Sequence, residues 1–312
     1  MIIVITTKKE KSCLAPDKKL KQISNELREK VIEICLDDKH NPVKTLISRL
    51  EDLKSHNCLE EIKFLVETKD SELITVLGDY NCLHTGDTER AINLDDDKAE
   101  LKWFLNMRGI AVANGFICPK DPCVELFEYP CFIKPSDDED SVGIDTDSLC
   151  RTPKQAEKVL KKLGTEKSIL VEEYLSGEEY TVAIVKKPDG SYLVLPARMD
   201  MPMNEHGDKF LDYKLKLSDD CKLKADMGEK KRKELVDLAL NTFEAIGATK
   251  YARIDIRDDL RGKAKVMEVN LYAGLGIDGY MANCFRAYNL SYRRMLEEVL
   301  STTELELFYA RK

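Results

Sequence analysis

Hydrophobic residues alternate with polar ones through the stretch 251–270, YARIDIRDDLRGKAKVMEVN. A two-residue period predicts β-strands with one buried and one polar face, and the polar run 258–262 predicts a hairpin turn between two strands. The buried face would carry four apolar residues: Ile254, Ile256, Met267 and Val269. The opposite face would carry four polar residues: Arg253, Asp255, Glu268 and Asn270.

The first 88 residues alternate apolar runs with amphipathic segments. The runs 2–6 and 73–77 predict strands. Helices are expected at three segments: 17–36, 42–53 and 59–66. Asn41 is the expected N-cap of the second helix, with Pro42 at its first position. This order predicts a small parallel sheet covered by helices. No GxGxxG follows the first strand, which disfavours a dinucleotide-binding fold.

The rest of the chain mixes helical and strand patterns. Apolar side chains spaced by three and four residues predict helices at four segments: 95–108, 153–163, 229–246 and 289–300. Shorter apolar runs predict strands at four others: 130–135, 168–173, 180–186 and 192–197. The polar stretch 204–219 and the glycine-bearing stretch 271–280 are expected to be loops.

Composition narrows the class of protein. Apolar residues make up 43% and charged residues 34% of 312 residues, which is typical of a soluble globular chain. A net charge of −8 disfavours nucleic acid as a partner. No apolar run approaches the length of a membrane span, and the first strand lacks the basic start of a signal peptide. Ten cysteines without a C-x-x-C motif disfavour zinc and indicate reduced thiols in the cytoplasm.

The polar face of the expected hairpin is a candidate metal site. Asp255, Glu268 and Asn270 supply hard oxygen ligands, which suit Mg²⁺ or Mn²⁺ better than zinc. The same pattern also arises in a sheet whose charged face is simply solvated.

Two lysines stand where a cation needs an explanation. Lys98 lies in the first turn of an expected helix, where the helix dipole disfavours a positive charge. This position hints that Lys98 reaches an anion elsewhere, and a solvated lysine beside three aspartates is the alternative. Lys134 lies inside an apolar strand and must extend to solvent or meet an anion. In the loop that follows, Ser141 and its neighbours could present backbone N–H groups to a phosphate.

Four sequence blocks resemble the ATP-grasp ligases, and among them the D-alanine–D-alanine ligase family. They are FIKPSDDEDSVGID, LVEEYLSGEEYTVAIV, LDYKLKLSD and RIDIRDDLRGKAKVMEVNLYAG. The resemblance covers about residues 82–300 well and implies an α/β (α+β) ATP-grasp fold. It divides the chain into three parts: an N-terminal α/β domain at 1–88, a central subdomain at 89–168 and a C-terminal subdomain at 169–312.

The resemblance also implies a role for each matching residue. Eight residues would bind ATP: Lys98, Lys134, Glu172, Glu173, Tyr174, Leu175, Glu179 and Lys216. Three would hold two Mg²⁺ or Mn²⁺ ions: Asp255, Glu268 and Asn270. Three would act in catalysis: Arg253, Lys216 and Ser141. Three would contact substrate: Gly274, Gly279 and Tyr280.

The substrate half departs from the family pattern. The loop 6–11 lacks the glycine- and serine-rich sequence and the matching glutamate that hold the first amino group. Gly279 stands where the family has a serine for the second substrate's carboxylate. The resemblance therefore implies a carboxylate–amine ligase that acts through an acyl phosphate on amino-acid-like substrates other than two D-alanines. A homodimer is a further candidate partnership. A D-alanine–D-alanine ligase with drifted contacts and an ATP-binding protein without turnover remain alternatives.

Overall fold

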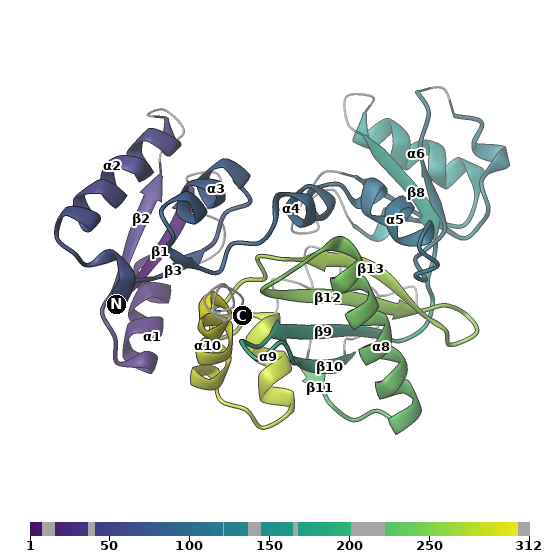
Figure 1. The fold of residues 1–312 in the computed structure, drawn as a ribbon. Coiled ribbons are helices and arrows are strands. Elements are labelled where there is room, and N and C mark those ends of the chain that lie inside the picture. The colour runs from purple at the N-terminus through teal and green to yellow at the C-terminus, as the bar shows by residue number, and fades with distance from the viewer. Residues whose placement is uncertain are drawn as a thin grey trace.

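The structure is a computed structural model. Its described residues form three sheets, which follow one another along the chain (Figure 1). Among the described residues, no helix is long and apolar enough to cross a membrane. The structure describes seven ranges: 1–7, 16–36, 41–120, 122–136, 145–164, 168–200 and 222–304.

The N-terminal domain contains a parallel sheet, as expected, and its strand order is β2-β1-β3-β4. The two faces of β1 belong to different cores. Ile3 and Ile5 pack on one face against helices of this domain, and Ile2 and Val4 pack on the other face against the C-terminal helices. The strands are β1 Ile2–Thr7, β2 Val31–Leu36, β3 Lys63–Val66 and β4 Leu83–His84. The helices are α1 Pro16–Leu27, α2 Pro42–Ser55 and α3 Ser71–Asp79.

Three predictions in this domain are wrong. The run 73–77, expected as a strand, lies in α3, because Asp70 caps the segment and its apolar residues then fall on one helical face. The segment 59–66, expected as a helix, is a single 3₁₀ turn, η3 Leu59–Glu61, followed by β3. The expected helix 17–36 ends at Leu27 and is followed by β2. By contrast, Asn41 accepts a hydrogen bond from the Lys44 N–H at 3.0 Å and caps α2 as predicted.

The central subdomain is an antiparallel sheet of strand order β5-β8-β6-β7 with α6 packed on it. Strand β8 pairs with β5 and β6, so a division by sheets places the subdomain border after Glu173 and not after residue 168. The strands are β5 Gly115–Ile117, β6 Cys131–Pro135, β7 Leu149–Cys150 and β8 Ile169–Glu173. The helical elements are α4 Glu89–Asp96, α5 Lys98–Asn106, η4 Val124–Leu126, η5 Thr146–Ser148 and α6 Pro153–Leu163.

The helix expected at 95–108 is two helices in the structure. Asp97 ends α4 and caps α5, accepting hydrogen bonds from the N–H groups of Ala99 and Glu100 at 2.9 and 3.0 Å. The cap separates Asp95 and Asp96, which close α4, from Lys98, which opens α5. A short polar side chain that bonds the backbone ahead of it favours a new helix start over a continuous helix.

The C-terminal subdomain is an antiparallel sheet of strand order β11-β10-β9-β12-β13. Helix α8 covers one face, and α9 and α10 cover part of the other (Figure 1). The strands are β9 Glu179–Lys186, β10 Tyr192–Asp200, β11 Lys222–Lys224, β12 Tyr251–Asp258 and β13 Ala264–Asn270. The helical elements are α8 Glu229–Ile246, α9 Tyr280–Ala287, α10 Tyr292–Ser301 and η6 Thr302–Glu304. Helix α9 is not among the helices expected from the sequence, and α10 begins three residues later than expected.

The predicted hairpin forms, with one correction. Strands β12 and β13 pair antiparallel, with Asp255 opposite Glu268 and Ile256 opposite Val266. This shift in register leaves Met267 as the extra residue of a β-bulge, so Met267 is only half-buried and Val266 takes its expected place in the core. A two-residue period cannot reveal a bulge, because the extra residue changes which side chains face the core.

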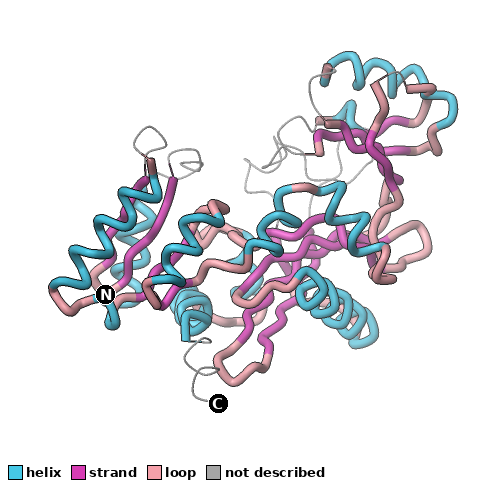
Figure 2. The backbone as a smooth tube through the Cα atoms, turned by 45° about the horizontal axis from the view of Figure 1, so that its top comes forward, coloured by secondary structure: helices cyan, strands magenta, loops and turns pink. Residues whose placement is uncertain are grey.

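The N-terminal domain and the central subdomain lie at different ends of the C-terminal sheet, with α4 and α5 running between them (Figures 1 and 2). The buried carboxylate of Asp87 fastens the first connection. It accepts hydrogen bonds from the Thr249 N–H at 2.9 and 3.0 Å and from the Thr249 hydroxyl at 3.0 Å. The Asp87 N–H also donates to the Tyr272 hydroxyl oxygen at 3.2 Å.

Candidate active site

Polar side chains fill one end of the sheet face opposite α8, in cross-strand rows. One row places Thr181 of β9 beside Asp255 of β12 and Glu268 of β13. Directly opposed residues on neighbouring strands have Cβ atoms about 5 Å apart, so such rows bring their side chains together. Two flanking rows complete the surface: Ala183, Arg253 and Asn270 on one side, and Glu179, Arg257 and Lys265 on the other.

Asp255 is the centre of the first hydrogen-bond network. Its two carboxylate oxygens accept from the Arg253 guanidinium, Nε at 3.1 Å and NH2 at 2.8 Å. The Thr181 hydroxyl donates at 2.8 Å and the Asn270 amide at 3.3 Å. Burial alone would weaken the charged form of Arg253, but the neighbouring Asp255 raises its pKa above the usual value. Arg253 therefore stays charged.

Glu172 of β8 is the centre of the second network, on the central subdomain. Lys134 of β6 lies 2.7 Å from one of its oxygens and Lys102 of α5 lies 2.6 Å from the other. All three residues are buried. Burial by itself would raise the pKa of Glu172, yet the two ammonium groups lower it to about 2. Lys134 thus meets an anion, which is one of the two outcomes expected for a lysine inside an apolar strand.

Two ion pairs join the subdomains. Lys98 of α5 lies 3.4 Å from Glu268 of β13, which confirms that this lysine reaches an anion outside its own helix. Lys265 of β13 pairs with Glu173 of β8, whose carboxylate also accepts the Asn114 N–H at 2.8 Å. The two networks therefore lie on facing elements, and the linker 174–178 connects them along the chain.

The linker leads into Glu179, a buried carboxylate at the start of β9. Arg257 of β12 donates from NH1 to Glu179 Oε2 at 3.2 Å and from Nε to the Gly177 carbonyl at 3.2 Å. Burial is the main cause that raises the pKa of Glu179 to about 7, while Arg257 opposes the shift. Glu179 therefore titrates near neutral pH, unlike Glu172.

The donor set on the hairpin fits a hard divalent cation. Asp255 and Glu268 are directly opposed and Asn270 follows two residues after Glu268, so two carboxylates and an amide share one surface. Oxygen donors without histidine or cysteine are the ligands of Mg²⁺ and Mn²⁺. No group of three or more His, Cys, Asp or Glu side chains suited to a metal occurs in the described part of the chain. Water and phosphate oxygens would have to complete the shell.

The three residues expected to contact substrate lie in the loop between β13 and α9, which holds Gly274 and Gly279, and at the first position of α9, which is Tyr280. The Gly279 N–H donates to the Gly276 carbonyl at 3.0 Å, and a Cβ at Gly279 would lie 2.8 Å from the Gly274 carbonyl oxygen. A side chain therefore fits at Gly279 only if the loop shifts. The ring of Tyr280 lies 5.4 Å from the Arg253 guanidinium carbon, and Gly274 is exposed.

Most of the residues that the resemblance implies gather around these two networks. Tyr174 and Leu175 follow β8 on the linker, with the Tyr174 ring 5.4 Å from the Arg257 guanidinium carbon. Lys216 and Ser141 lie outside the described residues, as does the expected loop 204–219.

Sequence reasoning missed three residues of the networks: Lys102, Thr181 and Arg257. Two of them, Lys102 and Arg257, had a detectable signal. Lys102 follows Lys98 by four residues and so shares its helical face. Arg257 follows Asp255 by two residues and so shares its strand face.

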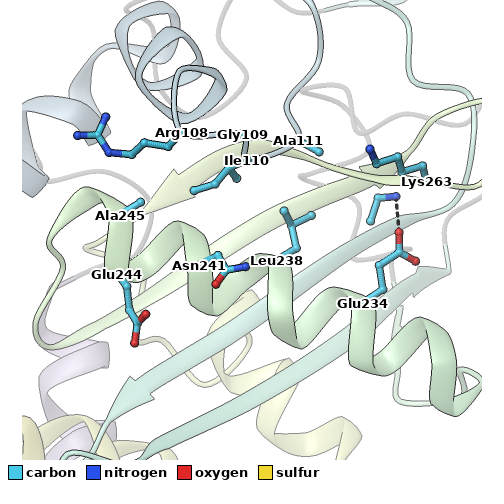
Figure 3. A pocket seen from close by; sticks show the side chains of 11 residues that line it. Arg108, Gly109, Ile110, Ala111, Glu234, Leu238, Asn241, Glu244, Ala245 and Lys263 are labelled. Carbon is cyan, nitrogen blue, oxygen red and sulfur yellow. Dashed lines mark hydrogen bonds between the residues drawn. The ribbon is translucent and has the colours of Figure 1, made fainter.

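A groove of about 630 Å³ lies away from the polar rows, between α8 and the 109–111 loop (Figure 3). Glu234 on its wall is committed to the Ala264 N–H at 3.0 Å and to Lys231 at 2.8 Å. Because α8 covers the opposite face of the sheet, this groove is separate from the candidate active site.

Comparison with known proteins agrees with the geometry. Residues 117–301, more than half of the chain, match the family model described as D-ala D-ala ligase C-terminus. A D-alanine–D-alanine ligase of Marinomonas sp. is 27% identical over 240 residues, covering 75% of this chain and 73% of that protein. One from Glaesserella parasuis is 29% identical over 223 residues, covering 67% and 68%.

Solved structures show the same fold. A D-alanine–D-alanine ligase from Bacillus anthracis complexed with ATP superposes with a TM-score of 0.71 at 16% identity, covering 100% of this chain and 99% of that one. A D-Ala:D-Ser ligase from Enterococcus faecalis gives 0.66 at 17% identity, covering 97% and 99%. The ATP-grasp architecture extends over the whole chain, and with the matching family model it leads to one conclusion: the chain belongs to the D-Ala–D-Ala ligase family of ATP-dependent ATP-grasp ligases.

Proposed function

We propose that this protein is a carboxylate–amine ligase that joins two amino-acid-like substrates through an acyl phosphate. The observation that carries the proposal is the pair of facing networks, Asp255–Arg253 on the hairpin and Glu172–Lys134–Lys102 on the central sheet. A carboxylate reacts poorly with an amine because oxide is a poor leaving group. Phosphorylation of the carboxylate supplies a better leaving group, and this step needs cations and metal ligands around phosphate instead of a protein nucleophile.

The Glu172 network and the linker suit a nucleotide. Glu172 is ionised at neutral pH and rigidly held, so it can accept a hydrogen bond from the amino group of adenine. Backbone groups near Tyr174 and Leu175 follow Glu172 by two and three residues and would read the base edge. Glu179 starts the next strand and would accept from the ribose hydroxyls. Lys98 and Lys134 would contact phosphate oxygens.

The hairpin suits the reacting end. Asp255, Glu268 and Asn270 would hold two Mg²⁺ or Mn²⁺ ions, which neutralise phosphate charge when bound. Arg253 remains charged and lies between Asp255 and the Tyr280 ring. From this position it would stabilise negative charge on the acyl phosphate and on the tetrahedral oxyanion formed as the amine attacks. Ser141 and Lys216 are proposed to complete the phosphate contacts.

Two observations bear on which amino acids this protein joins. The curated relatives named above are D-alanine–D-alanine ligases, and one structural neighbour is named a D-Ala:D-Ser ligase. In this chain Gly279 offers no hydroxyl, and its N–H is already used within the loop. This difference favours a pair other than two D-alanines, with D-alanine–D-alanine ligation as the second candidate.

The test is ADP and phosphate release with a panel of L- and D-amino acids offered singly and in pairs, with and without Mg²⁺. We expect release that requires Mg²⁺ and at least one specific pair, and a mass increase corresponding to an amide product. ATP binding without release under any pair would instead indicate a nucleotide-binding protein without turnover.

A further inference from the structure

Arg257 is a buried arginine for which the functional assignment above gives no role. It is 4% exposed and lies in one cross-strand row with Glu179 and Lys265. Its guanidinium makes three different contacts: NH1 to Glu179 Oε2 at 3.2 Å, Nε to the Gly177 carbonyl at 3.2 Å, and its central carbon 5.4 Å from the centre of the Tyr174 ring. All three partners lie on the segment 174–179, which connects the two subdomains.

Asp258, the residue after Arg257, holds the same segment against β12 through two backbone hydrogen bonds. The Gly177 N–H donates to the Asp258 carbonyl at 3.0 Å, and the Asp258 N–H donates to the Glu178 carbonyl at 2.9 Å. A Cβ at Gly177 would lie 2.6 Å from the Asp258 Cβ, so the linker and β12 approach each other as closely as a glycine permits. The linker therefore has a fixed position against β12, with Arg257 at its inner side.

Glu179 needs such support for the role proposed above. A carboxylate that accepts hydrogen bonds from ribose hydroxyls must be ionised and must keep an oxygen directed toward them. Burial favours its neutral form, and the nearby charges of Asp255 and Glu268 add to that effect. Among the described residues, Arg257 is the cation that contacts Glu179 directly; it occupies Oε2, which leaves Oε1 for another donor.

We propose that Arg257 is a positioning residue that sets the discrimination for ribose hydroxyls by holding Glu179 ionised and oriented. This inference rests on the proposed function, since it requires a nucleotide between the subdomains. An arginine suits this position better than a lysine. Its planar fork can serve Glu179 and Gly177 at once while it stays near the Tyr174 ring, whereas a lysine offers a single ammonium.

The experiment measures calorimetric dissociation constants for ADP and for 2′,3′-dideoxyADP, which lacks both hydroxyls. In the parent protein we expect dideoxyADP to bind at least about tenfold more weakly, the size expected from losing hydrogen bonds to a charged group. In Arg257→Met, ADP itself should bind about tenfold more weakly and the two ligands should differ by less than about threefold. Arg257→Lys should give an intermediate ratio of the two dissociation constants, that of dideoxyADP divided by that of ADP.

Two further proteins separate positioning from general damage. Arg198→Met removes an arginine that pairs with Glu178 at 3.6 Å and Asp226 at 3.0 Å, next to the same linker but without touching Glu179. It should keep the parent ratio. In a Glu179→Gln background, Arg257→Met should change the ratio no further, because Arg257 acts through that carboxylate. Thermal unfolding of each variant shows that it is folded.

The outcomes distinguish this inference from the function on which it rests. If the parent does not bind ADP, the proposed nucleotide site is wrong and the inference falls with it. If the parent binds and discriminates but Arg257→Met keeps the parent ratio, only the role of Arg257 is wrong. A parent ratio near one also refutes it, because Glu179 then reads no hydroxyl. If Arg257→Met does not fold, an unchanged ratio in Arg257→Lys refutes the proposal, and a reduced ratio supports it.

Discussion

Charged side chains of the site are held by partners of opposite sign at nearly every position. Glu172 has two lysines, Asp255 has Arg253, and Glu268 has Lys98. Removing one member of a buried pair leaves an uncompensated charge and typically costs about 3–5 kcal/mol, whereas a near-isosteric amide keeps the packing. Substitutions at these residues should therefore be conservative if activity is to be separated from folding.

The metal assignment predicts that Glu268→Gln and Asp255→Asn each lower turnover by at least about a hundredfold, the size of a lost charged interaction in the transition state. The reason is that one carboxylate fewer leaves a cation under-coordinated. ADP release at several Mg²⁺ concentrations measures the effect. Glu244→Gln, an exposed residue on the α8 face, is the matched control and should behave as the parent. Parental rates in both site variants would refute the metal role.

Glu179 predicts a dependence on pH. Its pKa of about 7 lies above the ordinary 4.5, so its neutral form adds stability at low pH, and this contribution is lost as pH rises from about 4.5 to about 7. Affinity for ADP should change in the opposite direction and increase through about pH 7, because the ionised form is the better acceptor. Calorimetric titration with ADP at several pH values measures this change in the parent and in Glu179→Gln. Because ADP ionises in the same way in both experiments, the difference between the two proteins reports on Glu179. Equal slopes of affinity against pH in the two proteins would contradict this assignment.

Among the elements, the hairpin and the linker decide the geometry of the site. The bulge at Met267 leaves Lys265 and Glu268 on the polar face while Val266 and Val269 stay in the core. Without this extra residue one half of β13 would present the wrong face. The linker matters in a similar way, because Gly177 lets it lie against Asp258 and so fixes where Glu179 begins β9.

Gly177→Ala should therefore destabilise the fold by about 1–3 kcal/mol, the usual cost of overpacking, and should also weaken ADP binding. Its Cβ would meet the Asp258 Cβ at 2.6 Å and the Asp258 carbonyl oxygen at 2.8 Å. Gly78→Ala is the control, because Gly78 is exposed in α3 with no atom within 4 Å of an added Cβ. That change should stabilise by about 0.5–1 kcal/mol and leave ADP binding unchanged. Denaturant unfolding and calorimetry measure the two quantities, and equal effects would contradict the close approach.

At the scale of the whole molecule, the proposed function divides the reaction between two subdomains. The central sheet and the linker would supply the nucleotide side, the hairpin would supply the metal and phosphate side, and the loop before α9 would supply the substrate contacts. Asp87 fastens the N-terminal domain beside this loop through Thr249 and Tyr272. The substrate end thus depends on how the first domain sits against the C-terminal sheet.

We predict that D-alanine as sole substrate does not support efficient turnover. A small zwitterion depends on a few charge-assisted contacts to its ammonium and carboxylate groups. Two of the family's contacts are missing from this sequence, the glutamate expected in the loop 6–11 and the serine replaced by Gly279. Each lost contact costs about 1–3 kcal/mol, so the two losses together weaken the use of D-alanine by roughly a hundredfold or more. Gly279 lacks a hydroxyl, and a side chain there would meet the Gly274 carbonyl oxygen at 2.8 Å. ADP release with D-alanine is compared with a mixed panel of L- and D-amino acids. A rate with D-alanine as high as with any other pair would overturn the prediction.

Local patterns were sufficient for elements with their own start and stop signals. Thr152 caps α6 through the Gln155 N–H, Gly247 ends α8, and the alternation at 251–256 gives β12. The same reasoning failed at 59–66 and 73–77, where short apolar runs fit a strand or a helix equally well. In each case packing against the parallel sheet and the cap at Asp70 selected the structure.

The sequence by itself determined the residue types of the site, because hard oxygen ligands and lysines in apolar surroundings are chemical requirements visible in a one-dimensional pattern. Only the tertiary structure decided their partners. Lys102 and Lys134 are 32 positions apart yet contact one carboxylate, and Arg257 meets Glu179 across two strands. Register, the Met267 bulge and the facing of the subdomains set these pairs. They depend on which surfaces pack together, and no local spacing encodes that choice.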